Sequence, residues 1–168
     1  MALPLLGPRC IRGRIAMNDL NIAATSYALL QGETNCWKCS ASIPVTAVWV
    51  PGFLDNEDEE YPEEGGAALL KYVSELDIGT MARVQAAAPW LKPSYSQTAN
   101  QTYLANHCEA CDALQGDHFI YGPDGPFFPQ DQASVDQLKV IQGHGSLMAS
   151  ASTAQSGWME LVKLPADG

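Results

Sequence analysis

Short runs of β-branched and aromatic residues, bounded by turn residues, recur along this chain and predict a fold dominated by β-strands. The clearest run is SIPVTAVWVPGF, residues 42–53, which ends at Pro51 and Gly52. The apolar-rich residues 22–32 before it fit a strand or a short helix, and we favour the strand. The two strands flank residues 36–39 and therefore predict a hairpin with these residues at its tip.

One stretch follows a helical period instead. In AALLKYVSEL, residues 67–76, the apolar positions form a stripe at helical spacing: Ala68, Leu69, Tyr72, Val73 and Leu76. Residues 77–88 continue with a second helical piece that includes Met81, Val84 and Ala88. The pattern predicts a helical insertion at about 67–90.

The pattern returns to strands after this insertion. Residues 100–106 are predicted as a strand that leads into a second pair of cysteines. Residues 118–121 are predicted as the strand that follows, before the turn sequence GPDGP. A second hairpin is therefore expected.

The C-terminal part also leans towards strands. Residues 146–152 and 158–164 are predicted as two of them. Residues 135–141 alternate between apolar and polar as a strand does, but they also place apolar residues on one helical face, so both interpretations stay open.

The chain has 168 residues, which suits one domain with a modest core. Residues 1–16 are basic, interrupted by proline and glycine, and without periodicity, so we interpret them as a flexible tail. Residues 17–168 are expected to form a single α+β, β-dominated domain. No apolar run approaches the ~18 residues of a membrane span, and a cytoplasmic protein without membrane contact is predicted.

Four of the five cysteines occur in two Cys-x-x-Cys pairs, Cys36 with Cys39 and Cys108 with Cys111. Each such turn places two sulfurs on one side of a tight loop, and two turns that face each other supply the four thiolates of a structural zinc site. The separation of the pairs exceeds the roughly 15–20 residues of a compact site. It is tolerable because loop closure costs only about 0.6 kcal/mol per doubling of loop length.

Two other interpretations of these cysteines are weaker. A redox dithiol needs a Cys-x-x-Cys at a helix N-terminus after a strand, a context that neither pair has. A catalytic zinc needs an open coordination position, and four cysteines fill it. Cys10 lies in the predicted tail with no base nearby and is interpreted as an incidental thiol.

The charge is strongly acidic, with 19 acidic against 9 basic residues and a net charge of −10. Seven acids fall within residues 55–64, a density that favours a solvated loop and also suits a docking patch for a basic protein. An acidic surface disfavours direct nucleic-acid binding. The candidate partner-binding residues are Trp37, Asp55, Glu57, Asp58, Glu59, Glu60, Glu63 and Glu64, where Trp37 either anchors a partner or packs over the metal turn.

Nothing in the sequence assembles a catalytic site, so we predict that the protein is not an enzyme. Neither HExxH nor Gly-x-Ser-x-Gly occurs. Of the three histidines, His107 is expected to be a surface or hairpin residue, with a role as a spare metal ligand or a donor to a ligand as the less favoured interpretation. His144 is expected at the surface and His118 in a strand. An unrecognised active site built on Asp117 and His118 remains an alternative.

Several motifs together resemble a group of uncharacterised bacterial zinc-ribbon proteins. They are CWKC at 36–39, LLKYV at 69–73, SQT at 96–98, and HCEACDALQGDHF at 107–119 with the later FFP at 127–129. The resemblance spans roughly residues 36–129. It implies a four-cysteine zinc ribbon, with two zinc-tipped hairpins and an inserted helical arm, and it implies no particular activity.

These observations favour a cytoplasmic, non-catalytic module that binds a basic protein. A concrete form is an inhibitor or immunity-type protein that neutralises a basic enzyme such as a nuclease toxin, because complementary charge speeds and selects such an association. The alternative is a nucleic-acid-linked or regulatory zinc ribbon, which requires Lys38, Lys71, Arg83 and Lys92 to converge on one face.

Overall fold

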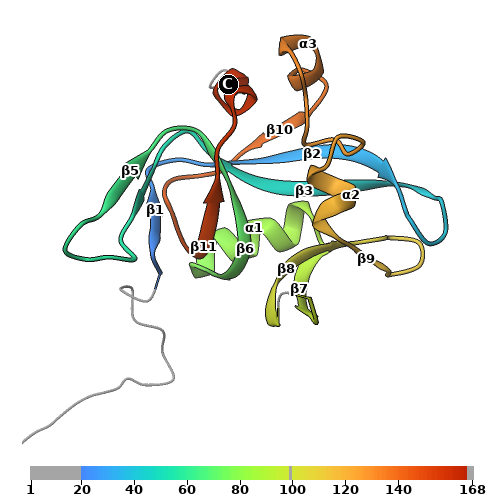
Figure 1. Ribbon diagram of the computed structural model, residues 1–168, viewed down its shortest axis with the longest axis horizontal. Coiled ribbons are helices and arrows are strands. Elements are labelled where there is room, and N and C mark those ends of the chain that lie inside the picture. The colour runs from blue at the N-terminus through green and yellow to red at the C-terminus, as the bar shows by residue number, and fades with distance from the viewer. Residues whose placement is uncertain (1–19, 99, 166–168) are drawn as a thin grey trace, which may run out of the picture.

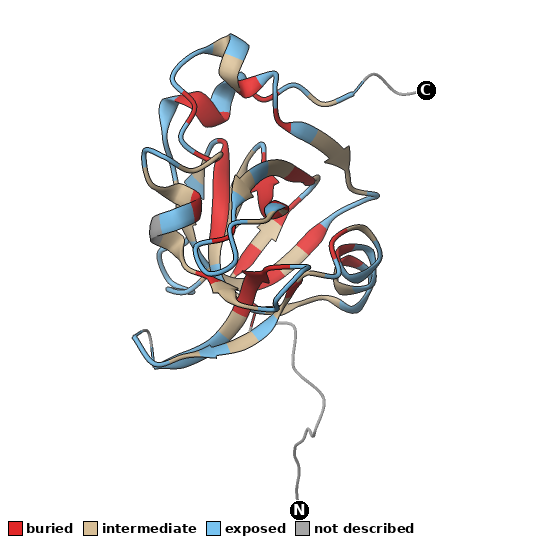
Figure 2. Ribbon diagram, turned by 90° about the vertical axis from the view of Figure 1, so that its right-hand side faces the viewer, coloured by how far each residue is buried: buried red, intermediate tan, exposed pale blue. Residues whose placement is uncertain are grey.

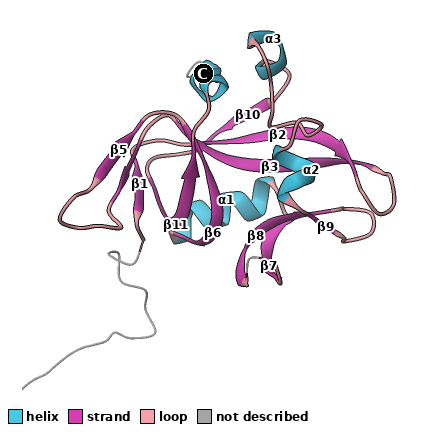
Figure 3. Cartoon of the chain, viewed as in Figure 1, coloured by secondary structure: helices cyan, strands magenta, loops and turns pink. Residues whose placement is uncertain are grey.

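The computed structural model describes residues 20–98 and 100–165, which form two antiparallel sheets with a few short helices (Figures 1 and 3). The predicted β-dominated α+β class is confirmed. The larger sheet has the strand order β10-β2-β3-β6-β11-β1-β4-β5. Its strands are β1 (Ile22–Ala24), β2 (Ala28–Asn35), β3 (Ser42–Val50), β4 (Phe53–Asp55), β5 (Glu63–Gly65), β6 (Ala68–Leu76), β10 (Lys139–Gln142) and β11 (Leu147–Ala154).

The smaller sheet has the order β7-β8-β9, with β7 (Leu91–Ser96), β8 (Gln101–His107) and β9 (Leu114–Gln115). The helices are α1 (Ile78–Ala87), α2 (Asp117–Tyr121), α3 (Gln132–Val135) and the 3-10 helix η2 (Gly157–Leu161). In the described part of the chain, no helix has the length and apolar character needed to cross a membrane. The predicted tail, residues 1–16 with Cys10, lies outside the described residues.

Both faces of the larger sheet are covered, and this explains the dense apolar character of its central strands. In β3, Val45 and Trp49 belong to one buried cluster while Val48 and Val50 belong to the other. Helix α1 covers the second cluster, and α3 and η2 cover the first from the opposite side of the sheet (Figure 1). The buried residues accordingly gather in the middle strands (Figure 2).

The predicted helix over residues 67–76 is wrong, because this segment is strand β6. Its apolar residues are buried on both faces of the sheet, so the sequence does not alternate between apolar and polar positions as a strand with one exposed face does. In addition, Tyr72 has a φ of 52°, and residues 72–74 lie opposite Ala151 alone in the pairing with β11. This bulge brings Leu70 and Val73, three residues apart, into the same buried cluster, and so imitates helical spacing. The helical insertion is thereby reduced to α1, which confirms the second predicted piece.

Two predicted strands are helices. Residues 118–121 fall in α2, and the second hairpin is closed by β9 instead. Residues 158–164 begin in η2, where the adjacent Trp158 and Met159 are both buried in one cluster, an arrangement that a strand would not give. The ambiguous residues 135–141 divide between the end of α3 and the start of β10. The predicted strands at 42–50, 100–106 and 146–152 are confirmed as β3, β8 and β11.

Asp77 joins α1 to the larger sheet. Its Oδ1 accepts a hydrogen bond from the Thr80 N–H at 2.9 Å and so caps the helix. Its Oδ2 accepts from the Thr80 hydroxyl and from the Met148 N–H of β11, both at 2.8 Å. One carboxylate therefore begins the helix and fixes it against β11.

Replacing Asp77 with alanine should destabilise the protein by about 1–3 kcal/mol, because the cap and a partly buried N–H lose their acceptor. Asp77→Asn should cost less, since one oxygen remains. Urea unfolding at pH 7 measures both. Asp124→Ala, at an exposed carboxylate, is the control and should change the unfolding free energy by less than about 0.5 kcal/mol. Equal losses for Asp77→Ala and Asp124→Ala would refute the role of Asp77.

Stability should also depend on pH through this residue. Burial tends to raise the pKa of Asp77, but the hydrogen bonds from Met148 and Thr80 outweigh it, and the pKa is lowered. A lowered folded pKa gives a contribution that is present above the unfolded value of about 3.9 and is lost as pH falls through the lower folded value. Wild type should therefore lose its advantage over Asp77→Asn below about pH 4, which urea unfolding across pH 2–7 would measure.

Candidate metal centre

The two cysteine pairs sit at the tips of two hairpins with the same pairing. Strands β2 and β3 close around the first pair with Asn35 opposite Ser42, and β8 and β9 close around the second with His107 opposite Leu114. In both hairpins the paired residues are the one before the first cysteine and the one six positions after it. Two strand pairs of different sheets thus present equivalent turns.

The backbone within the two turns is also equivalent. The Cys36 N–H donates to Ala41 O at 2.8 Å, and the Cys108 N–H donates to Ala113 O at 2.9 Å. The residue after each second cysteine has a left-handed backbone, with φ of 67° at Ser40 and 64° at Asp112. Such a conformation is least costly for short polar residues among those with a Cβ. The repeated sequence Cys-x-x-Cys-polar-Ala therefore carried a signal for these turns that the sequence analysis missed.

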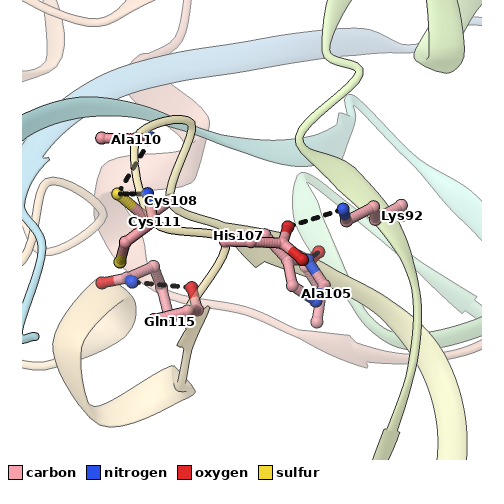
Figure 4. A network of polar contacts seen from close by, with 9 residues as sticks. Lys92, Ala105, His107, Cys108, Ala110, Cys111 and Gln115 are labelled. Carbon is pink, nitrogen blue, oxygen red and sulfur yellow. Dashed lines mark hydrogen bonds and ion pairs between the residues drawn. The ribbon is translucent and has the colours of Figure 1, made fainter.

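Backbone N–H groups point at the first sulfur of each pair. The N–H groups of Lys38 and Cys39 donate to Cys36 Sγ at 3.3 and 3.4 Å. Ala110 and Cys111 donate to Cys108 Sγ at the same distances, and Figure 4 shows this second turn. Donors aimed at a sulfur favour its thiolate form, the form that binds metal.

The hairpins bring all four sulfurs together. Their Sγ atoms lie within 4.8 Å of one another, with Cys36 and Cys111 3.7 Å apart and Cys39 and Cys108 3.6 Å apart. Four sulfurs placed tetrahedrally about 2.3 Å from one ion are about 3.8 Å apart. The predicted clustering of these cysteines is confirmed, and the cluster could hold a metal ion.

The thiols differ in acidity when no metal is bound. Burial opposes ionisation of Cys36, but the N–H groups of Cys39 and Lys38 and the Gln115 amide prevail and lower its pKa to about 6. At Cys111 the Ala113 N–H favours the thiolate, but burial and the neighbouring sulfurs of Cys36, Cys108 and Cys39 outweigh it and raise its pKa to about 12. One thiolate is therefore ready for a metal at neutral pH, whereas Cys111 must lose its proton.

Gln115 is a site residue that no sequence pattern indicates. This residue of β9 is buried, and its Nε2 donates to Cys36 Sγ at 3.3 Å. Figure 4 shows its side chain beside Cys111 of its own hairpin. It belongs to the second hairpin but contacts a cysteine of the first. Only the tertiary arrangement of the two hairpins creates this contact.

The histidines follow the predictions in part. His107 is a hairpin residue at the end of β8, which is one of the two expectations, but it is not at the surface, because its ring is buried and its Nδ1 lies 2.9 Å from Ala105 O. Among the described residues, the metal-competent cluster contains the four cysteines and no histidine. His144 is exposed, as expected, and His118 lies in α2 rather than in a strand.

Trp37 packs over the metal turn, which is one of the two roles that the sequence left open. Its indole N–H donates to Leu114 O of the second hairpin at 2.6 Å, and its ring stacks near Phe119 with centroids 6.4 Å apart. The residue nevertheless remains 53 % exposed. It thus packs across the two hairpins and still offers an aromatic surface.

The acidic residues lie on a separate hairpin. Strands β4 and β5 pair with Asp55 opposite Glu63, and they project at the end of the molecule opposite the cysteine hairpins (Figure 1). Asp55 accepts hydrogen bonds from Asn21 Nδ2 and from the Glu57 N–H, both at 3.0 Å. Asp58 Oδ1 accepts hydrogen bonds from the backbone N–H groups of Glu60 and Tyr61. The exposed acidic side chains of this acidic hairpin, residues 53–65, are Glu57, Asp58, Glu59, Glu60, Glu63 and Glu64.

An open groove of about 940 Å³ lies beside the acidic hairpin. Residues 56–60 form one side of it, and the bulged stretch around Tyr72 and Ser150 contributes the other. The bulge interrupts the regular pairing of β6 with β11 at this point. The groove therefore lies at a local irregularity of the sheet.

Two lysines in the described part of the chain form ion pairs with carboxylates. Lys71 Nζ lies 3.3 Å from Asp117 and over the ring of Tyr121, and Lys92 Nζ lies 2.7 Å from Asp112. Two of the four cations required by the nucleic-acid alternative are thus paired with carboxylates. Asp117 is likewise engaged in an ion pair.

Comparisons with models of known protein families, with curated proteins and with solved structures find no match for this chain. The resemblance to zinc-ribbon proteins therefore stays a prediction.

Metal binding should release protons and weaken as pH falls, because all four thiols must be deprotonated. At pH 7 Cys111 should contribute close to one proton and Cys36 very little, given their pKa values of about 12 and about 6. Zinc titration with a pH indicator measures the protons released, and titration between pH 5 and 8 measures affinity. An affinity that does not change over this range would contradict thiolate ligation.

Proposed function

We propose that the four cysteines bind one structural zinc ion and that the protein acts without catalysis, by presenting its acidic hairpin to a basic protein partner. The observation that carries the first part is the set of four sulfurs at spacings suited to tetrahedral coordination. The second part depends on the charge and exposure of residues 55–64.

The donor set supports zinc. Tetrahedral sites of four thiolates suit zinc or iron, and a closed set of four leaves no position for substrate. The ion would tie the β2–β3 hairpin of the larger sheet to the β8–β9 hairpin of the smaller one. With the ion bound, the protein would be a zinc ribbon with two metal-tipped hairpins, and the role of the ion would be to stabilise the fold.

The charge distribution supports a basic partner. The net charge is −10, and the acidic hairpin extends away from the metal-tipped end with most of its carboxylates in solvent. The adjoining groove offers carboxylates to lysine or arginine side chains. Complementary charge raises association rates and selects among partners. An inhibitor or immunity-type protein that neutralises a basic enzyme, such as a nuclease toxin, is the concrete form of this proposal.

Protein purified without chelator should contain about one equivalent of zinc per chain. Cys108→Ser should lose it and melt at a lower temperature, because one ligand is missing and two hairpins are released. Cys10→Ser, outside both cysteine pairs, is the matched control and should retain the full equivalent. Metal analysis by mass spectrometry and thermal unfolding measure these effects. Less than about half an equivalent in wild type would refute a closed, high-affinity zinc site.

The acidic hairpin is tested with an oligoarginine peptide at low salt. The triple variant Glu57→Gln, Glu59→Gln and Glu60→Gln should bind this peptide about tenfold or more weakly than wild type, as measured by calorimetry. The control triple variant has the same net charge but changes exposed acids elsewhere: Glu33→Gln, Glu109→Gln and Asp124→Asn. If both triples lose affinity equally, net charge alone acts and the hairpin is not a docking site.

A further inference from the structure

Gln115 connects the two cysteine hairpins through its side-chain amide. It lies on β9, opposite Asn106 of β8, and is 1 % exposed. Its Nε2 donates to Cys36 Sγ of the other hairpin at 3.3 Å and to Ala113 O at 2.9 Å. A buried amide is thus held in the second hairpin and directed at a sulfur of the first.

The orientation of this amide carries a cost. Gln115 Oε1 is buried and has no hydrogen-bond partner, and an unsatisfied buried acceptor destabilises a folded protein. The opposite orientation would place this oxygen against the Ala113 carbonyl and the Cys36 sulfur, and the sulfur in its thiolate form is, like the carbonyl, only an acceptor. The two acceptors therefore determine the direction of the amide, although its oxygen is left unpaired.

The equivalence of the hairpins shows that this contact is additional to the turn itself. Gln115 lies seven positions after Cys108, and the residue seven positions after Cys36 is the buried Ile43. Ile43 has no donor to offer. Cys36 therefore receives a side-chain donor in addition to the two backbone N–H groups that each first cysteine accepts.

We propose that Gln115 is a positioning residue of the metal centre, which holds Cys36 Sγ towards the other three sulfurs and disperses part of its negative charge. This inference rests on the proposed metal site. Four thiolates around a divalent ion carry a net charge of −2, in a protein that is already strongly acidic. A neutral amide donor reduces the repulsion between the sulfurs, and hydrogen bonds of this kind orient metal ligands and raise affinity.

Cobalt substitution tests the proposal, because Co(II) bound by four thiolates has sulfur-to-metal charge-transfer bands that report the energy of the sulfur electrons. Gln115→Met removes the donor with little change of volume, and Gln115→Glu keeps the shape but replaces the donor by an acceptor. Both should bind Co(II) and zinc at least about tenfold more weakly in competition with a chelator. In Gln115→Met the bands should move to longer wavelength, because a thiolate without its hydrogen bond gives up electron density more easily.

Ile43→Val is the matched control, since it changes a buried side chain at the equivalent position of the other hairpin. It should leave the charge-transfer bands and the metal affinity unchanged. If wild type binds Co(II) through four thiolates but Gln115→Met has the same affinity and bands, the role of Gln115 is refuted while the metal site stands. If Ile43→Val shifts both readouts as Gln115→Met does, packing rather than the hydrogen bond acts, and the inference also fails. If wild type binds neither metal, the proposed function itself is refuted.

Discussion

The convergence of four cysteine sulfurs is the constraint on which the arrangement of the two sheets depends. Each sheet contributes one hairpin, and each hairpin ends in a turn whose backbone N–H groups face its first sulfur. Like-charged thiolates repel one another, so a bound cation is what would make this approach favourable. Cys36 and Cys108 are buried in the same cluster as Trp49 and Phe127, so the proposed metal centre is continuous with the hydrophobic core.

Within the larger sheet, burial on both faces has a second consequence. Strands β2 and β3 supply apolar residues to two cores at once, with α1 closing one core and the C-terminal segments closing the other. The bulge in β6 is tolerated there because the displaced residue, Tyr72, is partly exposed and packs edge-on against Tyr103 of β8. The same irregularity borders the groove beside the acidic hairpin. The bulge in β6 thus helps to shape the groove beside the acidic hairpin, where we propose that the partner binds.

The molecule separates its two chemical features. The two cysteine hairpins lie at one end and the acidic hairpin at the other (Figure 1). Carboxylates close to four thiolates would add repulsion, and the ion pair of Lys92 with Asp112 neutralises one acid beside the second turn. The separation leaves the acidic hairpin in solvent, where a binding partner would meet its carboxylates without disturbing the cysteine hairpins.

The sequence by itself determined the features that depend on neighbouring residues. The Cys-x-x-Cys turns, strands β2, β3 and β8 beside them, and α1 follow from local spacing, turn chemistry and periodicity. Only the tertiary structure decided the rest. Residues 68–76 became a strand because both sheet faces are covered and a bulge alters their period, and α2 and η2 replaced predicted strands because adjacent residues pack into one core. The contacts of Gln115 with Cys36 and of Trp37 with Leu114 join residues more than seventy positions apart. No local pattern encodes such contacts, because they exist only once the two hairpins meet.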